Sequence, residues 1–382
     1  MTQERRKKQF SFSVKQLRPK EASSEDVYCL QALLARYGYL VGPYVPGEYD
    51  EAMQRAVAQF QSFYNIYPDE DGICDCSTVD LLNQPRCGMP DPPPGQRSAA
   101  GRLAPYVTVG SKWPKNDLRF KFLNSSPDIL PQRQREIIRE SFKRWSDVCA
   151  LRFTEVQGAE VPDLSVAFHR GSHGDGNPFD NGGRPDGNTL AHAFFPPPTG
   201  GPWAGSLHFD EYELWKDQPG GSGTRLYNVA LHEIGHLLGL AHSQDQNAIM
   251  YAYYAENRND LRADDIAGIQ SLYGSPITAP IAIAPGQQVS GHLPQTNAEM
   301  RYQVTLQNKL LIKLDGPNGQ DFDLYVRYGA PAGRKTGEYD IASYGATADE
   351  LVTIPNPKAG TYYILVHSYN GPGSYNLEVE VV

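Results

Sequence analysis

The sequence lacks three features that would each indicate a particular class of protein. No apolar run approaches the ~20 residues that a membrane-spanning helix needs. There is no basic excess, because 35 Lys and Arg against 44 Asp and Glu give a formal net charge of −9, which argues against a dedicated nucleic-acid binder. Cysteine is scarce, with five in 382 residues. The composition, 40% hydrophobic and 21% charged, is that of a folded chain rather than a disordered one.

The five cysteines permit two interpretations. Cys29, Cys74, Cys76 and Cys87 lie in the first quarter of the chain, and Cys149 stands alone. Cys74 and Cys76 are too close together for an easy mutual bridge, so Cys29 with one of them is the disulfide to consider. Buried free thiols, as in a reducing compartment, are the alternative that the sequence leaves open.

Residues 1–21 are basic and polar, and we expect them to be disordered. They have a basic start but lack the apolar core of about 7–15 residues that follows it in a secretory signal. Either the true start lies elsewhere, or export uses another route, or the protein stays inside the cell.

Composition and periodicity divide the rest of the chain into three folded parts. Apolar residues at helical spacing predict three short helices within 22–91, and the Pro/Gly-rich stretch 92–105 follows as a linker. Residues 106–275 alternate predicted strands and helices. Residues 276–382 show alternating strands with turn clusters between them, which predicts a small antiparallel β-sandwich.

The strongest chemical signal is the segment His232-Glu233-Ile-Gly-His236-Leu-Leu-Gly239-Leu-Ala-His242. On a helix, residues i and i+4 share a face, so His232 and His236 can bind one zinc ion. Gly239 can adopt a positive φ, which ends the helix and brings in His242 as a third ligand. Glu233 lies beside the first ligand, where it can take a proton from the attacking water. Three protein ligands leave the fourth position open, as in catalytic zinc sites.

A methionine completes this pattern, because Ala248-Ile-Met250-Tyr stands where metzincin peptidases have their Met-turn. With this motif, residues 25–275 or so resemble the matrix metalloproteinases, or matrixins. The resemblance implies a multidomain chain with a three-helix prodomain similar to peptidoglycan-binding domains and an α/β catalytic domain with a mixed twisted sheet. It also implies a zinc-dependent metalloendopeptidase, made as a latent zymogen, that hydrolyses extracellular proteins by metal-activated water.

The segment Pro-Arg86-Cys87-Gly-Met89-Pro-Asp resembles the cysteine switch of matrixin propeptides, with methionine where valine is usual. A thiolate is a strong zinc ligand, so Cys87 in the fourth position would displace the attacking water. In the family the arginine of this motif pairs with an acidic group of the catalytic domain, which suggests that Arg86 makes such a pair and orients the segment. A structural or disulfide-bonded Cys87 is the alternative.

The resemblance also implies further metal sites between residues 163 and 213. A structural zinc ion would be held in a closed shell by His173, Asp175, His192 and His208. Calcium would be bound by the side chains of Asp180, Asp210 and Glu213 and by the backbone carbonyls of Asn181, Gly183 and Thr189. Asp163 matches a ligand of a second calcium ion, although Ser206 stands where that site has aspartate. We therefore expect two zinc ions and one or more calcium ions; a flexible acidic loop without ions is the alternative.

Two further segments bear on specificity and docking. Asn228, four residues before His232, would line the substrate pocket together with the loop around residues 251–257. Residues 280–382 resemble the bacterial pre-peptidase C-terminal domain, on the segments Asp321-Phe-Asp323-Leu-Tyr-Val and Gly-Thr-Tyr-Tyr-Ile-Leu-Val at 360–366. Asp321 and Asp323 would share the strand face opposite the apolar residues, which favours a solvated face over a calcium site.

The expected partners are protein or peptide substrates, with no nucleic acid and no membrane span, and we expect a monomer. The terminal domains suggest docking to a cell-wall or matrix polymer, and the family suggests a secreted, extracellular protein. Two other functions stay open, a non-catalytic wall- or matrix-binding protein and a zinc amidase acting on peptidoglycan. The intact Glu233 argues against the first, and the third histidine with Met250 argues against the second.

Overall fold

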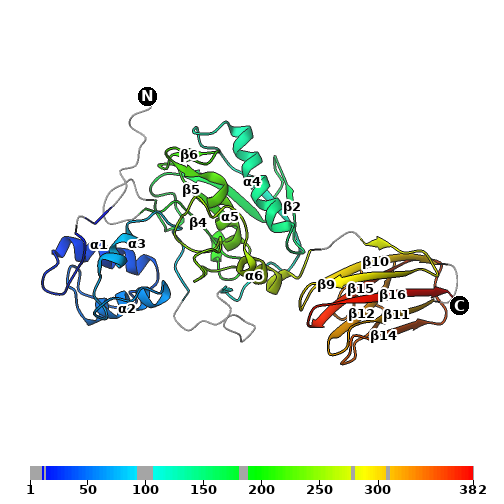
Figure 1. The fold of residues 1–382 in the computed structure, drawn as a ribbon. Helices are drawn as coiled ribbons and strands as arrows, with labels where there is room; N and C mark the ends of the chain where they lie inside the picture. The colour runs from blue at the N-terminus through cyan, green and yellow to red at the C-terminus, as the bar shows by residue number, and fades with distance from the viewer. Residues whose placement is uncertain are drawn as a thin grey trace. The chain divides into compact units, whose positions relative to one another are not determined.

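The computed structural model describes residues 11–12, 14–92, 106–179, 188–276, 280–306 and 310–381. The chain separates into two compact units, Met1–Tyr273 and Gly274–Val382. The first unit contains a helical part followed by a part with strands and helices, and the second is built from strands (Figure 1). The multidomain class predicted from the sequence is confirmed.

The helical part comprises α1 (Ser24–Arg36), α2 (Glu51–Phe63) and α3 (Cys76–Leu82). Each helix begins after a side chain that accepts a hydrogen bond from a backbone N–H of the first turn, namely Ser23, Asp50 and Asp75. The apolar faces of α1 and α2 enclose a core that contains Leu30, Leu33, Val57 and Phe60. This core also includes Tyr251, Ala252 and Tyr253 from the second part of the unit, so the two parts pack together.

The start of the chain has more structure than we expected. Residues 1–10 and 13 lie outside the described residues. Leu17 is fully buried, and its backbone N–H donates to the carbonyl of Cys74 at 2.8 Å. An apolar side chain at this position completes the helical core, so order begins before residue 22.

The expected disulfide is absent, because all five cysteines are free thiols. Cys29 and Cys74 are buried in the helical core, whereas Cys76 is exposed at the first position of α3. Burial raises the pKa of Cys74 well above its usual range, which keeps it a neutral thiol. The structure therefore has free thiols, which is the alternative that the sequence left open.

The second part of the first unit is built on a five-stranded sheet in the order β2-β1-β3-β5-β4. Its strands are β1 (Asp117–Phe122), β2 (Arg152–Glu155), β3 (Leu164–His169), β4 (Ala191–Ala193) and β5 (Ser206–Asp210). All neighbouring pairs are parallel except β4 with β5, so β4 is an antiparallel edge strand. A short 3-10 turn, η1 (Gly201–Trp203), precedes β5, and the two-residue strands β6 (Trp215–Lys216) and β7 (Thr224–Arg225) pair with each other.

Three helices complete this part: α4 (Pro131–Ser146), α5 (Leu226–Leu237) and α6 (Ala263–Tyr273). The indole N–H of Trp145 in α4 donates to the carbonyl of Leu231 in α5 at 2.9 Å. Buried side chains of both helices share one core with the sheet, including Ile137, Phe142, Val166, Phe209 and Ile234. This packing holds α5 beside the edge strand β4, where the site described below lies.

The second unit is a sandwich of two sheets, in the orders β13-β12-β15-β10-β8 and β14-β11-β16-β9. Its strands are β8 (Ile281–Ala282), β9 (Gln288–Leu293), β10 (Glu299–Leu306), β11 (Leu310–Asp315), β12 (Asp321–Tyr328), β13 (Ile341–Ser343), β14 (Glu350–Ile354), β15 (Gly360–Asn370) and β16 (Gly373–Val381). The pairing is antiparallel except between β8 and β10. Buried Ile312, Leu324, Ile364 and Leu377 lie in its core.

We expected a solvated face at the start of β12, but the side chain of Asp323 is buried there. This side chain accepts a hydrogen bond from the hydroxyl of Tyr325 and lies 3.1 Å from Nδ1 of His367.

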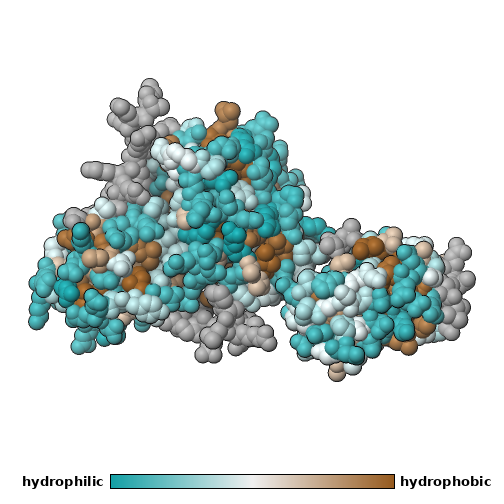
Figure 2. Space-filling model, viewed as in Figure 1, coloured by the Kyte–Doolittle hydropathy of each residue, from teal (hydrophilic) through white to brown (hydrophobic). Residues whose placement is uncertain are grey.

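Among the described residues, no helix combines the length and the apolar composition for crossing a bilayer. The face of the molecule seen in Figure 2 is mostly hydrophilic, with apolar residues in small scattered groups.

Candidate metal centre and active site

The helix α5 and the turn after it gather the three predicted zinc ligands. His232 and His236 lie on one face of α5, which ends at Leu237. Gly239 has a φ of +102°, and a Cβ atom there would lie 2.5 Å from the carbonyl oxygen of Ser111. Only glycine fits this turn, which returns the chain so that His242 faces the helix. The positive φ predicted for Gly239 is confirmed.

The three imidazoles converge through their Nε2 atoms. The Nε2 atom of His236 lies 3.1 Å from Nε2 of His232 and 3.1 Å from Nε2 of His242. Each opposite nitrogen, Nδ1, faces an oxygen: the carbonyl of Ile249 for His232, the carbonyl of Leu240 for His236, and the carboxylate of Asp91 for His242. Because each Nδ1 is therefore the N–H donor, each Nε2 presents a lone pair to the centre of the group.

This donor set fits a zinc ion. Three converging lone pairs repel one another, and a cation that lies among them removes this repulsion. Burial holds the pKa of His232 and His236 well below the usual value, so both are neutral, as a metal ligand must be. Ligands of a tetrahedral zinc ion lie roughly 3.3–3.6 Å apart, which is close to the spacing seen here.

The Sγ atom of Cys87 occupies the remaining corner of this group. It lies 3.4 Å from Nε2 of His236, and the four ligand atoms all lie within 4.8 Å of one another. The segment that carries it is bound on both sides: Cys87 donates to the carbonyl of Ala252 at 3.0 Å, and Gly88 donates to the carbonyl of Ala191 at 2.8 Å. A Cβ at Gly88 would lie 2.7 Å from the side chain of Thr189, so this close approach requires glycine.

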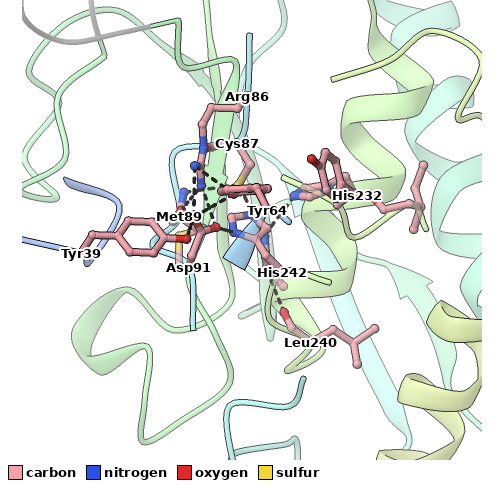
Figure 3. Close-up of polar contacts among 12 residues, drawn as sticks. Tyr39, Tyr64, Arg86, Cys87, Met89, Asp91, His232, Leu240 and His242 are labelled. Atoms are coloured by element: carbon pink, nitrogen blue, oxygen red, sulfur yellow. Dashed lines mark hydrogen bonds and ion pairs between the residues drawn. The ribbon is translucent and has the colours of Figure 1, made fainter. Parts of the chain in front are cut away.

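Arg86 does not pair with the catalytic part as expected, but with Asp91 of its own segment, at 3.0 Å (Figure 3). Both side chains are fully buried, and the guanidinium lies 3.7 Å from the ring centroid of Tyr37. Asp91 is the nearest acceptor because the segment turns back on itself between Cys87 and Asp91, where the Arg86 side chain also donates to the carbonyls of Cys87 and Met89. Burial alone would raise the pKa of Asp91, but the charge of Arg86 holds it well below its usual range.

Glu233 lies on α5 directly after the first ligand and is completely buried. Neither carboxylate oxygen has a hydrogen bond of normal geometry among the described residues, although the thiol of Cys87 lies close enough to interact with it. Burial raises the pKa of Glu233 to about 8, so the closed site favours its protonated form. Once water enters the site, the ionised form of Glu233 becomes more favourable, and that carboxylate is a candidate general base.

Met250 is buried against Gly235 of α5, and an aspartate of α6 holds its backbone. The backbone N–H groups of Ile249 and Met250 donate to the carboxylate of Asp265 at 2.9 and 3.0 Å. The neighbouring Asp264 accepts from the hydroxyl of Ser243 at 2.6 Å. Both aspartates are buried, so their position in the first turn of α6 serves these contacts rather than solvation. The sequence signal was present, as two adjacent acids after the Met-turn.

A pocket opens beside Glu233 and contains the predicted specificity residue. Its lining includes Asn228, Val229, His232, Tyr251 and Arg258. The side-chain amide of Asn228 donates to three backbone carbonyls of the loop opposite, those of Ala255, Glu256 and Arg258, at 3.3, 2.9 and 2.8 Å. Asn228 therefore fixes the loop that walls the pocket, which is a role that its position in the motif could not reveal.

The second predicted zinc set also comes together. The Oδ2 atom of Asp175 lies 2.8, 2.7 and 2.8 Å from nitrogens of His173, His192 and His208, and the ligand atoms form one group. Burial lowers the pKa of His208 to about 4, so its imidazole is neutral near pH 7. Three imidazoles around one carboxylate are the donor set of a closed zinc site.

The predicted calcium ligands are only partly described. Asp180, Asn181 and Gly183 lie outside the described residues, whereas Thr189, Asp210 and Glu213 lie within them. Asp210 is fully buried at the end of β5 and accepts from the N–H of Tyr212 at 2.8 Å. Asp163 is 2.8 Å from the ammonium of Lys115 and accepts from the N–H of Arg119 at 2.9 Å. Both carboxylate oxygens of Asp163 thus have protein partners. The ammonium of Lys115 supplies the positive charge that a second calcium ion would bring to this position.

Comparison with known families agrees with this geometry. Residues 112–274 match the Matrixin model, residues 23–82 the Putative peptidoglycan binding domain, and residues 301–368 the Bacterial pre-peptidase C-terminal domain. Human matrix metalloproteinase-16 is 37% identical over 271 residues, which cover 67% of this chain and 43% of that protein. Karilysin of Tannerella forsythia is 45% identical over 175 residues, or 45% of this chain and 35% of that one. Rat macrophage metalloelastase is 37% identical over 241 residues, or 62% and 47%.

The sheet, the helix α5 with His232 and His236, and His242 after it form the arrangement of a metzincin-type zinc site. Residues 112–274 are similar to matrixin domains, and the segments on either side are similar to a peptidoglycan-binding domain and a pre-peptidase C-terminal domain. The chain spans less than half the length of the curated relatives named above.

Proposed function

We propose that this protein is a zinc-dependent metalloendopeptidase made as a latent zymogen. The observation that carries the proposal is the position of Cys87, whose Sγ atom completes the group formed by His232, His236 and His242. Zinc bound by these histidines would supply a Lewis acid that polarises the scissile carbonyl. Cys87 as a fourth ligand would exclude the water that must attack, which keeps the uncut chain inactive.

Glu233 is the proposed catalytic residue. It takes a proton from the attacking water as general base and then passes it to the leaving amine, so no covalent intermediate forms. In the closed form its pKa of about 8 favours the protonated state. Departure of the segment around Cys87 would let water reach the carboxylate and lower that pKa, since burial is its main cause.

The hydrogen bonds of the N-terminal segment support an extended peptide as substrate. The carbonyls of Asn188, Ala191 and Ala252 accept from the segment, and the N–H groups of Leu190 and Tyr254 donate to it. These five backbone groups belong to the two walls of the cleft beside the metal group. A peptide substrate would pair with the same groups in place of the segment, and Asn228 with the loop 255–258 would shape the pocket for one of its side chains.

The remaining assignments follow from the same sites and from the family. We propose two zinc ions per chain, the second at His173, Asp175, His192 and His208. We propose one calcium ion near Asp210 and Glu213. Residues 22–91 would form the prodomain, 92–105 the activation linker, 106–275 the catalytic domain and 276–382 the C-terminal domain. We further propose that the protein is monomeric and extracellular, acts on proteins, and docks to wall or matrix polymers through its terminal domains.

The test compares hydrolysis of a peptide library by the full chain and by the chain cut within residues 92–105, each with and without a chelator. We expect cleavage only by the cut form, and none with chelator present. Hydrolysis of purified peptidoglycan but not of peptides would instead indicate an amidase. No hydrolysis of either by a zinc-loaded, cut protein would favour a binding protein.

A further inference from the structure

One zinc ligand differs from the other two in the partner of its outer nitrogen. The Nδ1 atoms of His232 and His236 face backbone carbonyls of the catalytic domain itself, those of Ile249 and Leu240, at 2.7 Å each. The Nδ1 atom of His242 instead lies 2.6 Å from a carboxylate oxygen of Asp91 (Figure 3). Asp91 belongs to the N-terminal segment, which the proposed activation removes.

We propose that Asp91 is a positioning residue for zinc that acts only in the uncut chain: its carboxylate orients His242 and tightens zinc binding at the catalytic site until the N-terminal segment leaves. The proposal rests on the proposed function, because it requires zinc at His232, His236 and His242. It is separate from the action of Cys87, which fills a coordination position, whereas Asp91 acts through a ligand that remains after cleavage.

The surroundings of Asp91 keep its carboxylate fixed. The hydroxyls of Tyr39 and Tyr64 both donate to its Oδ2 atom at 2.8 Å, and the guanidinium of Arg86 donates to Oδ1 at 3.0 Å. Tyr39 and Tyr64 belong to the helical core, so the carboxylate is anchored to the prodomain as a whole. Its remaining interaction, with His242, is the one that leads to the metal group.

The charge of this group suits a neutral histidine. Arg86 lies against Asp91 with both side chains at 0% exposure, so the negative charge is already balanced by a positive one. His242 can therefore stay neutral, with its proton on Nδ1 and its lone pair on Nε2. A carboxylate that accepts this N–H fixes the tautomer and makes the imidazole a stronger ligand, and loss of such a partner typically weakens metal binding about 10- to 100-fold.

After activation, His242 would lose this partner while His232 and His236 keep theirs. The uncut chain should hold the catalytic zinc more tightly than the mature enzyme, even when Cys87 makes no contribution. The prodomain would then secure zinc loading as well as latency.

The test measures zinc dissociation constants by chelator competition in a full chain that carries Cys87→Ser and Glu233→Ala. The first change removes the thiolate, and the second prevents self-cleavage without touching a ligand. Adding Asp91→Asn should weaken one zinc about 10- to 100-fold and leave the zinc of the His173 group unchanged. Equal constants with and without Asp91→Asn would overturn the proposal.

Tyr64→Phe provides the matched control, because it removes one hydrogen bond to Asp91 but keeps the carboxylate beside His242. It should leave both zinc constants unchanged. If it weakened zinc as much as Asp91→Asn, general loosening would explain the effect and the proposal would fail. The catalytic fragment purified after linker cleavage should bind zinc as weakly as the uncut Asp91→Asn chain; tighter binding would also refute the proposal.

A measurement on the zinc-loaded wild type needs no Asp91 variant. Nitrogen NMR of labelled histidines should show the Nδ1–H proton of His242 in a strong hydrogen bond in the uncut chain, and its loss after cleavage. The same signal in both forms would contradict the proposal. Failure of the proposed function is separate, since it would appear as a cut wild-type protein without peptidase activity whatever Asp91 does.

Discussion

The Sγ atom of Cys87 lies 3.4 Å from Nε2 of His236, although the two residues are 149 positions apart in the chain. The contact is possible because residues 85–88 lie between the backbone of residues 188–191 and that of residues 252–254, with five hydrogen bonds along the way. The thiol is therefore delivered to the metal group by an extended segment in a cleft, and not by a disulfide or by a local loop.

Latency is the first consequence to test. Intact Cys87→Ala should hydrolyse a peptide substrate without linker cleavage, or should process itself during expression, because alanine cannot ligate zinc. Intact wild type should be nearly inactive until it is cut in the linker, before Tyr106. The measurement is peptidase activity of these three forms at equal zinc content. An intact wild type as active as its cut form would refute the switch.

Loss of the proposed general base should abolish catalysis without loss of metal. Glu233→Ala should fold and bind zinc as the wild type does, because the carboxylate is not a ligand, and its turnover after linker cleavage should fall by at least about 10²–10⁴-fold. Activity and zinc content are measured on the same preparations. Near-wild-type turnover would show that the base has been assigned to the wrong residue.

The metal content tests the second histidine group. We expect two zinc ions in the wild type and one in His192→Ala, because His192 lies 2.7 Å from Asp175 and 3.3 Å from His208 in that group. Elemental analysis of protein freed from loosely bound metal gives both counts. A single zinc in the wild type, or two in the variant, would exclude a zinc ion at this group.

The sequence predicted which donor side chains come together more completely than it predicted their surroundings. His232, His236 and Gly239 could be assigned because helix geometry and positive φ act over a few residues. The partner of Arg86 was predicted wrongly, because the choice between Asp91 and an acid of the catalytic domain depends on how the segment turns within the cleft. The role of Asp265 could not be predicted, since nothing local shows that its carboxylate reaches the backbone of Met250.

In the fold, too, the features set by neighbouring residues could be predicted, and those set by distant contacts could not. The boundaries of α4 and the alternating strands of the sandwich can be read from periodicity, which is a property of neighbouring residues. Burial of Leu17 and of Asp323 depends on contacts with distant residues, Cys74 and His367. The same is true of the cysteines, because a spacing permits a disulfide but does not bring Cys29 to Cys76.

Lowering the pH should weaken the contacts that Asp91 makes with Arg86 and His242 only in the strongly acidic range. The pKa of Asp91 lies well below its usual value despite burial, because of Arg86 and His242. Its stabilising effect is therefore complete above the ordinary aspartate pKa of about 4 and is lost as the pH falls below that value. The urea midpoint of metal-free wild type should exceed that of Asp91→Asn throughout the range from pH 8 to pH 5. A margin that disappeared between pH 7 and pH 5 would show that Asp91 titrates in the ordinary range.

The last prediction concerns the wall of the pocket, which is held in place by the side-chain amide of Asn228. Asn228 donates to the carbonyls of Ala255, Glu256 and Arg258, and these bonds hold the loop opposite α5. Asn228→Asp has nearly the same shape but cannot donate, so it leaves these carbonyls without their partner, at a cost of about 1–3 kcal/mol for a buried group. We expect a lower melting temperature and a broader choice of the substrate side chain bound there, measured with a peptide library on the cut enzyme. Asn228→Ser, which keeps one donor, should lie between wild type and Asn228→Asp in both measurements. Unchanged selectivity in a destabilised Asn228→Asp enzyme would show that the loop supports the domain but does not shape the pocket.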